Sequence, residues 1–213
     1  MRLAALTIPA LALVLITAIA IGAWLVVGQS TSSGEGRPPA SVYQGAGETN
    51  LDLESADNIL YLDLPAGRVT IQMRPDLAPK HVARIKELTR QGYYDGLSFH
   101  RVIEDFMAQG GDPLGTGAGG SGINIPAEFS SQKFERGVVG MARSRNIDSA
   151  DSQFFIMLGN ARWLDGKYTV WGRVIEGMGA VDALKKGDKT ANGKISGEPD
   201  KIVRMLIKAD AAD

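Results

Sequence analysis

The spacing of hydrophobic and polar positions changes along the chain, and each change marks a different kind of element. From Leu3 to Val27 no residue is charged, which is typical of a segment directed to a membrane. Residues 29–57 are rich in Gly, Ser, Pro and Thr and have no sustained apolar period, which is typical of a flexible linker. Residues 58–210 carry regular apolar patterns that predict a folded domain. The pattern therefore divides the chain into residues 1–28, 29–57 and 58–210.

Within the predicted domain, alternating apolar residues indicate eight strands, and three-residue spacings indicate two helices. The strands lie at residues 60–64, 69–73, 99–101, from 106–107 onward, and at 137–144, 152–158, 168–175 and 201–209. The helices are marked by Val82, Ile85 and Leu88 and by Met178, Val181 and Leu184. Sequential antiparallel turns favour a mainly β fold, a closed eight-stranded antiparallel β-barrel capped by two α-helices. An open sandwich is the alternative.

The apolar N-terminal segment predicts the location of the protein. Ala10 to Val27 alone would form a helix of about 27 Å, whereas the apolar region of a signal peptide has about 7 to 15 residues. Arg2 precedes the segment, which predicts an N-in, C-out orientation. We expect a transmembrane anchor with an extracytoplasmic, periplasmic domain. The alternative is a signal helix cleaved at a small-x-small site such as Ala18 and Ala20, which would release the domain into the periplasm.

Composition excludes several classes of chemistry. The absence of cysteine excludes a lipoprotein anchor, disulfides and a thiolate nucleophile. Without Arg2, 22 basic residues face 24 acidic ones, and the longest basic cluster is Lys185 and Lys186, so we expect no nucleic-acid partner. The two histidines have no ligand spacing, which predicts no metal site. We expect His81, on the first helix, to be solvated or to cap it.

The stretch 98–112, SFHRVIEDFMAQGGD, predicts a hairpin with Glu104 and Asp105 in its turn. It places Arg101 beside an apolar face. Taken alone, it favours a core hairpin whose arginine extends to water. The glycine-rich segment that follows lacks the Lys-Ser/Thr pair of a phosphate loop, so we expect a surface loop.

Several motifs together carry a resemblance to a known family. In chain order they are FHRVIEDFMAQGGD, GTGAGG, GMARS, SQFFI and WLDGKYTVWGRV. They resemble cyclophilin-type peptidyl-prolyl cis-trans isomerases over about Asn58 to Ala209, and the short NIDSADS connection is similar to the bacterial branch. The resemblance implies an eight-stranded antiparallel barrel, a helix at each end and a proline-binding groove on the outer face. It also implies proline-containing polypeptides as partners, without cofactor or metal, and we expect a monomer.

The resemblance also implies roles for individual residues. Arg101 is similar to the family's catalytic arginine, and Gln109 is the second expected catalytic residue, which can orient that arginine or the peptide. The substrate-binding positions implied by the resemblance are Phe106, Met107, Ala142, Arg143, Gln153, Phe155, Trp163, Leu164 and Tyr168. Of these, Phe106, Met107, Phe155 and Leu164 match the apolar proline pocket. The family often has histidine where this chain has Tyr168. The tyrosine leaves the pocket wall in place but lacks the imidazole, so the resemblance implies no polar role at this position.

The physical chemistry of this assignment is coherent. Rotation about an X-Pro bond crosses a barrier of about 18–20 kcal/mol, and the proline nitrogen becomes basic in the twisted state. A guanidinium that donates to this nitrogen binds the twisted state better than either planar form. We therefore expect an isomerase that assists the folding of exported proteins. The alternatives are a proline-binding or holdase module that uses the same groove, and an assembly factor whose isomerase activity is incidental.

Overall fold

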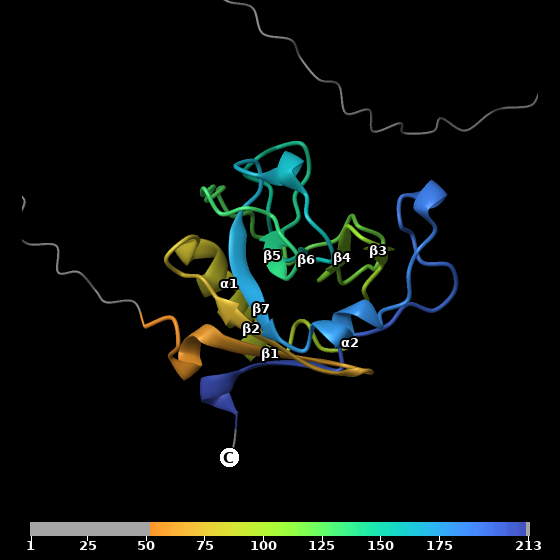
Figure 1. The fold of residues 1–213 in the computed structure, drawn as a ribbon. Helices are drawn as coiled ribbons and strands as arrows, with labels where there is room; N and C mark the ends of the chain where they lie inside the picture. The colour runs from red at the N-terminus through yellow and green to blue at the C-terminus, as the bar shows by residue number, and fades with distance from the viewer. Residues whose placement is uncertain (1–51, 212–213) are drawn as a thin grey trace, which may run out of the picture. The chain divides into compact units, whose positions relative to one another are not determined.

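Residues 52–211 are described by a computed structural model, in which eight antiparallel strands form one strongly curled sheet with two helices (Figure 1). The strands are β1 (Ile59–Leu64), β2 (Gly67–Met73), β3 (Arg101–Ile103), β4 (Met107–Gly110), β5 (Val138–Met141), β6 (Phe154–Met157), β7 (Val170–Glu176) and β8 (Arg204–Ile207). The helices are α1 (Pro79–Arg90) and α2 (Met178–Asp182). The mainly β class, the strand number and the two helices are thus confirmed.

The predicted closure of the barrel is wrong. The strand order is β3-β4-β6-β5-β7-β2-β1-β8, so β3 and β8 are the two edges of the sheet and do not pair with each other. The gap between them is spanned by irregular backbone, with a bridge from Ser98 to Lys201 and a hydrogen bond from Phe99 N to the carbonyl of Asp200 at 2.9 Å. The sheet is therefore a half-barrel.

The segment that could have closed the barrel cannot form a strand, because its backbone turns repeatedly. Asn192, Gly193 and Gly197 have φ angles of 55°, 78° and 75°, in the left-handed region that extended strands do not use. Val102 still makes two backbone hydrogen bonds with this part of the chain: its N–H donates to the carbonyl of Gly193, and its carbonyl accepts the N–H of Gly187. The segment therefore covers the edge of β3 without becoming a ninth strand.

Two apolar clusters lie on opposite faces of the sheet, and β6 contributes to both. Phe154 is fully buried in the larger cluster, where its ring centroid lies 6.0 Å from that of Trp171, edge to face. The next residue, Phe155, belongs to the second cluster and stacks on Phe134 at 5.7 Å. This alternation follows from the period of two along a strand. β6 therefore gives one phenylalanine to the larger cluster and the other to the second cluster on the opposite face.

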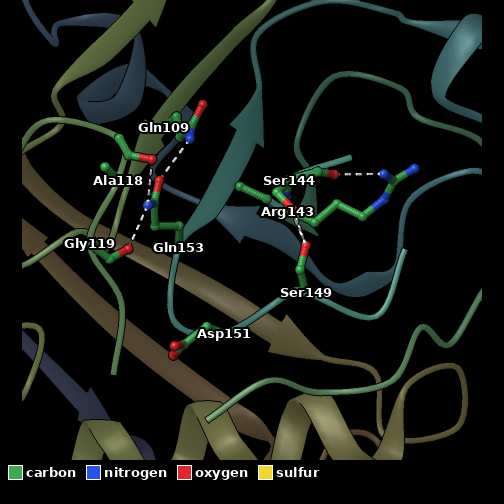
Figure 2. Close-up of a pocket in the computed structure, with 10 residues that line it drawn as sticks. Gln109, Ala118, Gly119, Arg143, Ser144, Ser149, Asp151 and Gln153 are labelled. Atoms are coloured by element: carbon green, nitrogen blue, oxygen red, sulfur yellow. Dashed lines mark hydrogen bonds between the residues drawn. The ribbon is translucent and has the colours of Figure 1, made fainter. Parts of the chain in front are cut away.

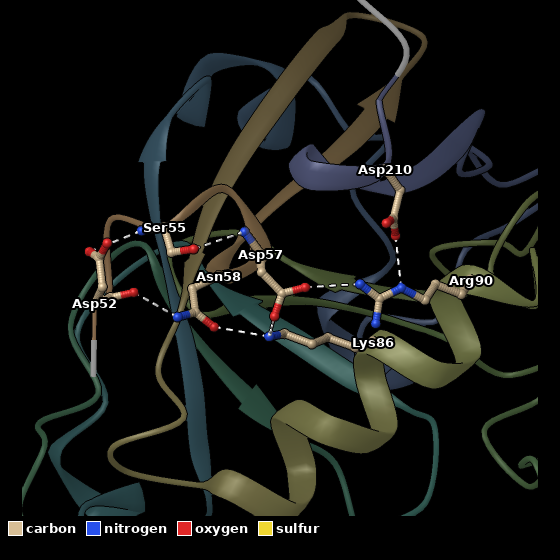
Figure 3. Close-up of polar contacts among 7 residues, drawn as sticks. All are labelled: Asp52, Ser55, Asp57, Asn58, Lys86, Arg90 and Asp210. Atoms are coloured by element: carbon tan, nitrogen blue, oxygen red, sulfur yellow. Dashed lines mark hydrogen bonds and ion pairs between the residues drawn. The ribbon is translucent and has the colours of Figure 1, made fainter. Parts of the chain in front are cut away.

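Both ends of the described chain are tied to α1 (Figure 3). Asp57 accepts from Lys86 Nζ at 2.5 Å and from Arg90 Nη2 at 2.9 Å, and Arg90 Nε donates to Asp210 at 2.8 Å. Residues 52–57, expected in the linker, include a 3-10 turn, η1 (Ala56–Asn58), at their end. The two carboxylates therefore bring the start and the end of this unit to the last turn of one helix.

The predicted N-terminal anchor and the linker up to residue 51 lie outside the described residues. Within residues 52–211, no helix is long and apolar enough to cross a membrane.

The expectation that His81 is solvated or acts as a cap is wrong. It is fully buried, and its Nδ1 lies 2.7 Å from Glu128 Oε2. His81 is drawn into this contact because α1 lacks a side-chain cap at its N-cap residue, Ala78. Glu128, from a distant loop, accepts the free N–H groups of Lys80 and His81 at 3.1 Å each and so caps the helix.

These contacts predict a pH-dependent stability. Burial lowers the pKa of His81, and the hydrogen bond to Glu128 offsets this only in part. The unfolded chain therefore binds a proton more readily than the folded one, so stability falls as pH drops below about 6.5. Urea unfolding from pH 8 to pH 5 should show this loss, at most about 1.4 kcal/mol per pH unit for this group. His81→Gln should reduce the slope; an unchanged slope would contradict the assignment.

Candidate active site

The β3–β4 hairpin places Arg101 and Gln109 side by side. They are directly opposite in the antiparallel register, so their side chains share one face of the hairpin. Arg101 Nη1 donates to Gln109 Oε1 at 3.1 Å. Asp105, in the turn, has a φ of 62°, which agrees with the predicted turn at Glu104 and Asp105. The hairpin and its turn agree with the sequence pattern, whereas the contact between Arg101 and Gln109 was implied by the family resemblance.

The strongest anchor of Arg101 is a residue that the sequence did not indicate. Asn192 follows the 3-10 turn η3 (Lys189–Ala191), and it accepts twice from the guanidinium. Its carbonyl oxygen receives Nε at 2.9 Å, and its side-chain Oδ1 receives Nη2 at 2.8 Å. The two residues are 91 positions apart. The sequence indicates this position only through the Asn-Gly pair at 192–193, which predicts a turn but not its contact with Arg101.

The guanidinium keeps its charge although it is half-buried. Burial lowers the pKa of Arg101 from its ordinary value, which lies far above neutral pH. The acceptors at Gln109 and Asn192 are all neutral amide oxygens. The positive charge is therefore held in place without being cancelled by a carboxylate at these contacts.

A directed chain of amides continues from Arg101 across the site (Figure 2). Gln109 Nε2 donates to Gln153 Oε1 at 2.9 Å, and Gln153 Nε2 donates to the carbonyls of Gly117 at 3.1 Å and Gly119 at 2.8 Å. Because arginine can only donate and a carbonyl can only accept, both amides have one possible orientation. The chain therefore ties the arginine to the glycine-rich loop.

An apolar cup lies beside the arginine. Met107 and Phe155 come from paired strands, and Leu164 comes from the 3-10 turn η2 (Arg162–Leu164). They are 2%, 5% and 9% exposed. The cavity that they form has a volume of about 130 Å³. Its lining comprises Arg101, Phe106, Met107, Gln109, Ala142, Arg143, Phe155, Leu164 and Tyr168. The structure thus brings nine of the eleven predicted site residues to one cavity.

The two remaining predicted residues lie next to this cup. Gln153 lines a second, adjoining cavity of about 240 Å³, which also includes Gln109, Ala142 and Arg143. Trp163 lines neither cavity and is 61% exposed, but its ring centroid lies 5.6 Å from that of Phe106. It therefore sits at the rim of the cup.

The glycine-rich loop is held by two aspartates that the sequence did not single out. Asp112 accepts backbone N–H groups from Leu114 at 2.8 Å and Thr116 at 2.9 Å, and these contacts outweigh its burial to lower its pKa. Asp151 accepts the N–H groups of Ser121 and Gly122, each at 2.8 Å. An aspartate that accepts backbone N–H groups within a loop cannot be recognised in the sequence except by its residue type. The two carboxylates fix one wall of the larger cavity.

His100 lies below the site rather than in it. It is 9% exposed and lines neither cavity. Its ring nitrogens make no hydrogen bond among the described residues, and burial lowers its pKa.

Comparisons with known proteins agree with this geometry. The sequence profile of the family "Cyclophilin type peptidyl-prolyl cis-trans isomerase/CLD" matches residues 59–207. The chain therefore belongs to the cyclophilin-type peptidyl-prolyl cis-trans isomerase family. It is a peptidyl-prolyl cis-trans isomerase, an enzyme that needs no cofactor.

Individual relatives support the same assignment. A probable peptidyl-prolyl cis-trans isomerase from Brucella suis is 51% identical over 166 residues, which cover 72% of this chain and 84% of the relative. This similarity agrees with the bacterial branch. The human peptidyl-prolyl cis-trans isomerase-like 1 is 43% identical over 131 residues, 59% of this chain and 78% of that protein.

Two solved structures share the fold. Cyclophilin AquaCyp293 from Hirschia baltica has a TM-score of 0.65 at 29% identity, covering 74% of this chain and 76% of that one. A cyclophilin-type isomerase from Cryptosporidium parvum, crystallised in the presence of the dipeptide Ala-Pro, has a TM-score of 0.64 at 29% identity. That match covers 70% of this chain and 98% of the other.

The double contact of Asn192 with Arg101 generates a prediction. Asn192→Gly removes the Oδ1 acceptor but keeps the carbonyl acceptor, and glycine tolerates the φ of 55°. We expect kcat/KM for a proline peptide to fall about fivefold, the equivalent of one hydrogen bond of about 1 kcal/mol. The thermal midpoint should not fall, because a left-handed position suits glycine. Unchanged kcat/KM would show that Asn192 does not position the arginine.

Proposed function

We propose that the isomerase acts on exported polypeptides, that it is held at the membrane by residues 1–28, and that Arg101 supplies the catalytic hydrogen bond. The observation that supports the catalytic role is the position of one charged guanidinium, fixed by neutral acceptors at the edge of an apolar cup. The uncharged segment from Leu3 to Val27 supports the membrane location.

The cup holds the proline ring while the acyl side of the bond turns. Met107, Phe155 and Leu164 offer buried apolar surface without a charge of their own. The cavity of about 130 Å³ is several times the roughly 30 Å³ that one water molecule occupies in the liquid, so a small ring can enter and displace water. Burial of the ring in this cup fixes one side of the rotating bond.

Arg101 stabilises the twisted state. Three of its five N–H groups donate to the oxygens of Gln109 and Asn192, and Nη1 also contacts the thioether of Met107 at 3.8 Å. Sulfur is a weak acceptor, so N–H groups remain for the proline nitrogen or for a carbonyl displaced in the twist. That nitrogen accepts only when amide resonance is lost, so the hydrogen bond is stronger in the transition state than in the planar forms.

No proton transfer is required in this mechanism. The lining of the cup holds two arginines and a tyrosine, and neither a carboxylate nor a histidine. The guanidinium acts as a preorganised donor that costs no rearrangement at the moment of rotation, because Gln109 and Asn192 already hold it.

Replacement of the arginine tests the catalytic role. Arg101→Ala should lower kcat/KM for an X-Pro peptide by about 10²–10³, or about 2.7–4 kcal/mol, as for one oxyanion-hole donor. The matched control is Arg173→Ala, which removes an exposed arginine of β7 and should leave the rate unchanged. Undiminished isomerisation by Arg101→Ala would contradict the mechanism. Peptide binding without acceleration by the wild-type protein would instead favour the proline-binding module.

Fractionation of cells tests the location. The protein should sediment with membranes, resist extraction by high salt, and begin at Met1 when its N-terminus is sequenced. Leu15→Arg should weaken insertion, because a central charge costs about 2.5–3.5 kcal/mol in a transmembrane helix, whereas Ser33→Arg in the linker should not. A mature N-terminus at Ile21 or beyond would refute the anchor and support export with cleavage. Soluble protein that begins at Met1 and stays in the cytoplasm would refute both.

A further inference from the structure

Arg143 holds a positive charge on the wall that the two cavities share, and its contacts leave this charge unbalanced. Its Nη1 donates to the carbonyl of Ser144 and its Nη2 to that of Lys167, both at 2.9 Å. Its Cζ lies 4.5 Å from the centre of the Tyr168 ring. Within residues 52–211, no Asp or Glu oxygen comes within ion-pair distance of this guanidinium.

Many of the arginines are held by carboxylates, and Arg143 is not among them. Within residues 52–211, six of the eleven arginines pair with carboxylates: Arg68, Arg74, Arg84, Arg90, Arg136 and Arg162. Arg143 instead has two carbonyls and an aromatic face, which fix its position but keep its full charge. An arginine held in this way is ready to receive an anion from outside the protein.

The charge lies at the wall of the proline cup. Figure 2 shows the Arg143 side chain extending away from Gln109 and Gln153. Its guanidinium covers Tyr168, and the Tyr168 ring meets Phe155 edge to face at 6.0 Å. Phe155 lines the cup itself. Arg143 and Tyr168 both line the cup, and the guanidinium lies on the Tyr168 ring at its wall. This position suits contact with the side chain of a residue that flanks the proline.

The larger cavity also contains a carboxylate. Asp151 lines this cavity and accepts from the backbone of Ser121 and Gly122 and from the Ser121 hydroxyl. These donors are neutral, and Arg84 donates to the Ser121 hydroxyl at 2.7 Å and pairs with Glu87.

Arg143 and Asp151 both line the larger cavity, which therefore holds charges of both signs, whereas the cup is lined by Arg143 and by no carboxylate. An acidic side chain on the cup side, beside Tyr168, would meet the cation without the repulsion of Asp151.

We propose that Arg143 makes this isomerase selective for polypeptides that carry a carboxylate side chain on a residue flanking the proline. The inference rests on the proposed function of the same groove and adds a substrate class to it. The acidic residue binds on the Arg143–Tyr168 side and is disfavoured on the Asp151 side. The preference amounts to about two- to fivefold, as for a solvent-accessible ion pair.

The experiment uses the full-length protein in mild detergent with short Ala-Pro peptides. Glu, Gln or Lys is placed in turn two residues before, directly before and directly after the proline, and kcat/KM is measured for each peptide. At one position, kcat/KM for Glu should exceed that for Gln about two- to fivefold, with Lys below Gln. The Glu/Gln ratio should approach one in about 0.5 M salt, because such pairs are screened.

Variants assign the preference to one residue. Arg143→Gln should bring the Glu/Gln ratio close to one, and Arg143→Lys should keep part of it. The matched control is Arg145→Gln, which removes an exposed cation two residues away that lines neither cavity and should keep the full ratio.

Three results would overturn the inference: a ratio near one at every position, a ratio that survives in Arg143→Gln, or an equal loss in Arg145→Gln. The Gln peptides separate this failure from failure of the proposed function. Isomerisation of Gln peptides without a Glu preference overturns only the selectivity. Absence of acceleration for Gln peptides as well overturns the proposed function and the selectivity with it.

Discussion

The site depends on holding an arginine half-buried without a counter-ion. A carboxylate beside Arg101 would fix the guanidinium equally well, but it would also compete with the substrate for the same N–H groups. Asn192 and Gln109 offer oxygens that carry only partial charge, so they orient the group and leave its full charge for the twisted peptide bond. The burial that lowers the pKa of Arg101 also reduces the screening of that charge by water.

Much of the surrounding structure serves this one placement. The β3–β4 register sets Gln109 opposite Arg101, and the backbone turn at Asn192 brings a second acceptor from a distant segment. From Gln109, the amide of Gln153 carries the connection to the glycine-rich loop. The open edge at β3 belongs to the same arrangement, because the segment that leaves the barrel unclosed is the one that provides Asn192. A regular closing strand would remove the positive-φ turn on which that contact depends.

Local patterns were enough to predict the features that depend on neighbouring residues. The β3–β4 hairpin and α1 follow from periods of two and 3.6 residues. The resemblance to the family added the residues that meet from separate strands, such as Phe155 and Leu164 beside Met107. Nine of the predicted residues line the cup, so the structure places motifs that are separate in the sequence around one cavity.

What the sequence did not predict are contacts between segments far apart in the chain. Asn192 lies 91 positions from Arg101 and Glu128 lies 47 from His81, and neither pair shares a periodic pattern. Closure of the barrel was wrongly predicted because an even set of antiparallel strands does not show which edges meet. Buried polar pairs such as His81 and Glu128 look like surface residues when only residue type is known.

Exchange spectroscopy on a bound peptide tests most directly whether the fixed guanidinium accelerates rotation. A proline peptide at saturation is compared on the wild-type protein and on Arg101→Lys, which keeps the charge but loses the planar set of donors. The cis-trans exchange rate on the enzyme should fall at least about tenfold, the equivalent of about 1.4 kcal/mol, while the dissociation constant changes by less than about twofold. An unchanged exchange rate, or a loss confined to binding, would contradict a role for Arg101 in the transition state.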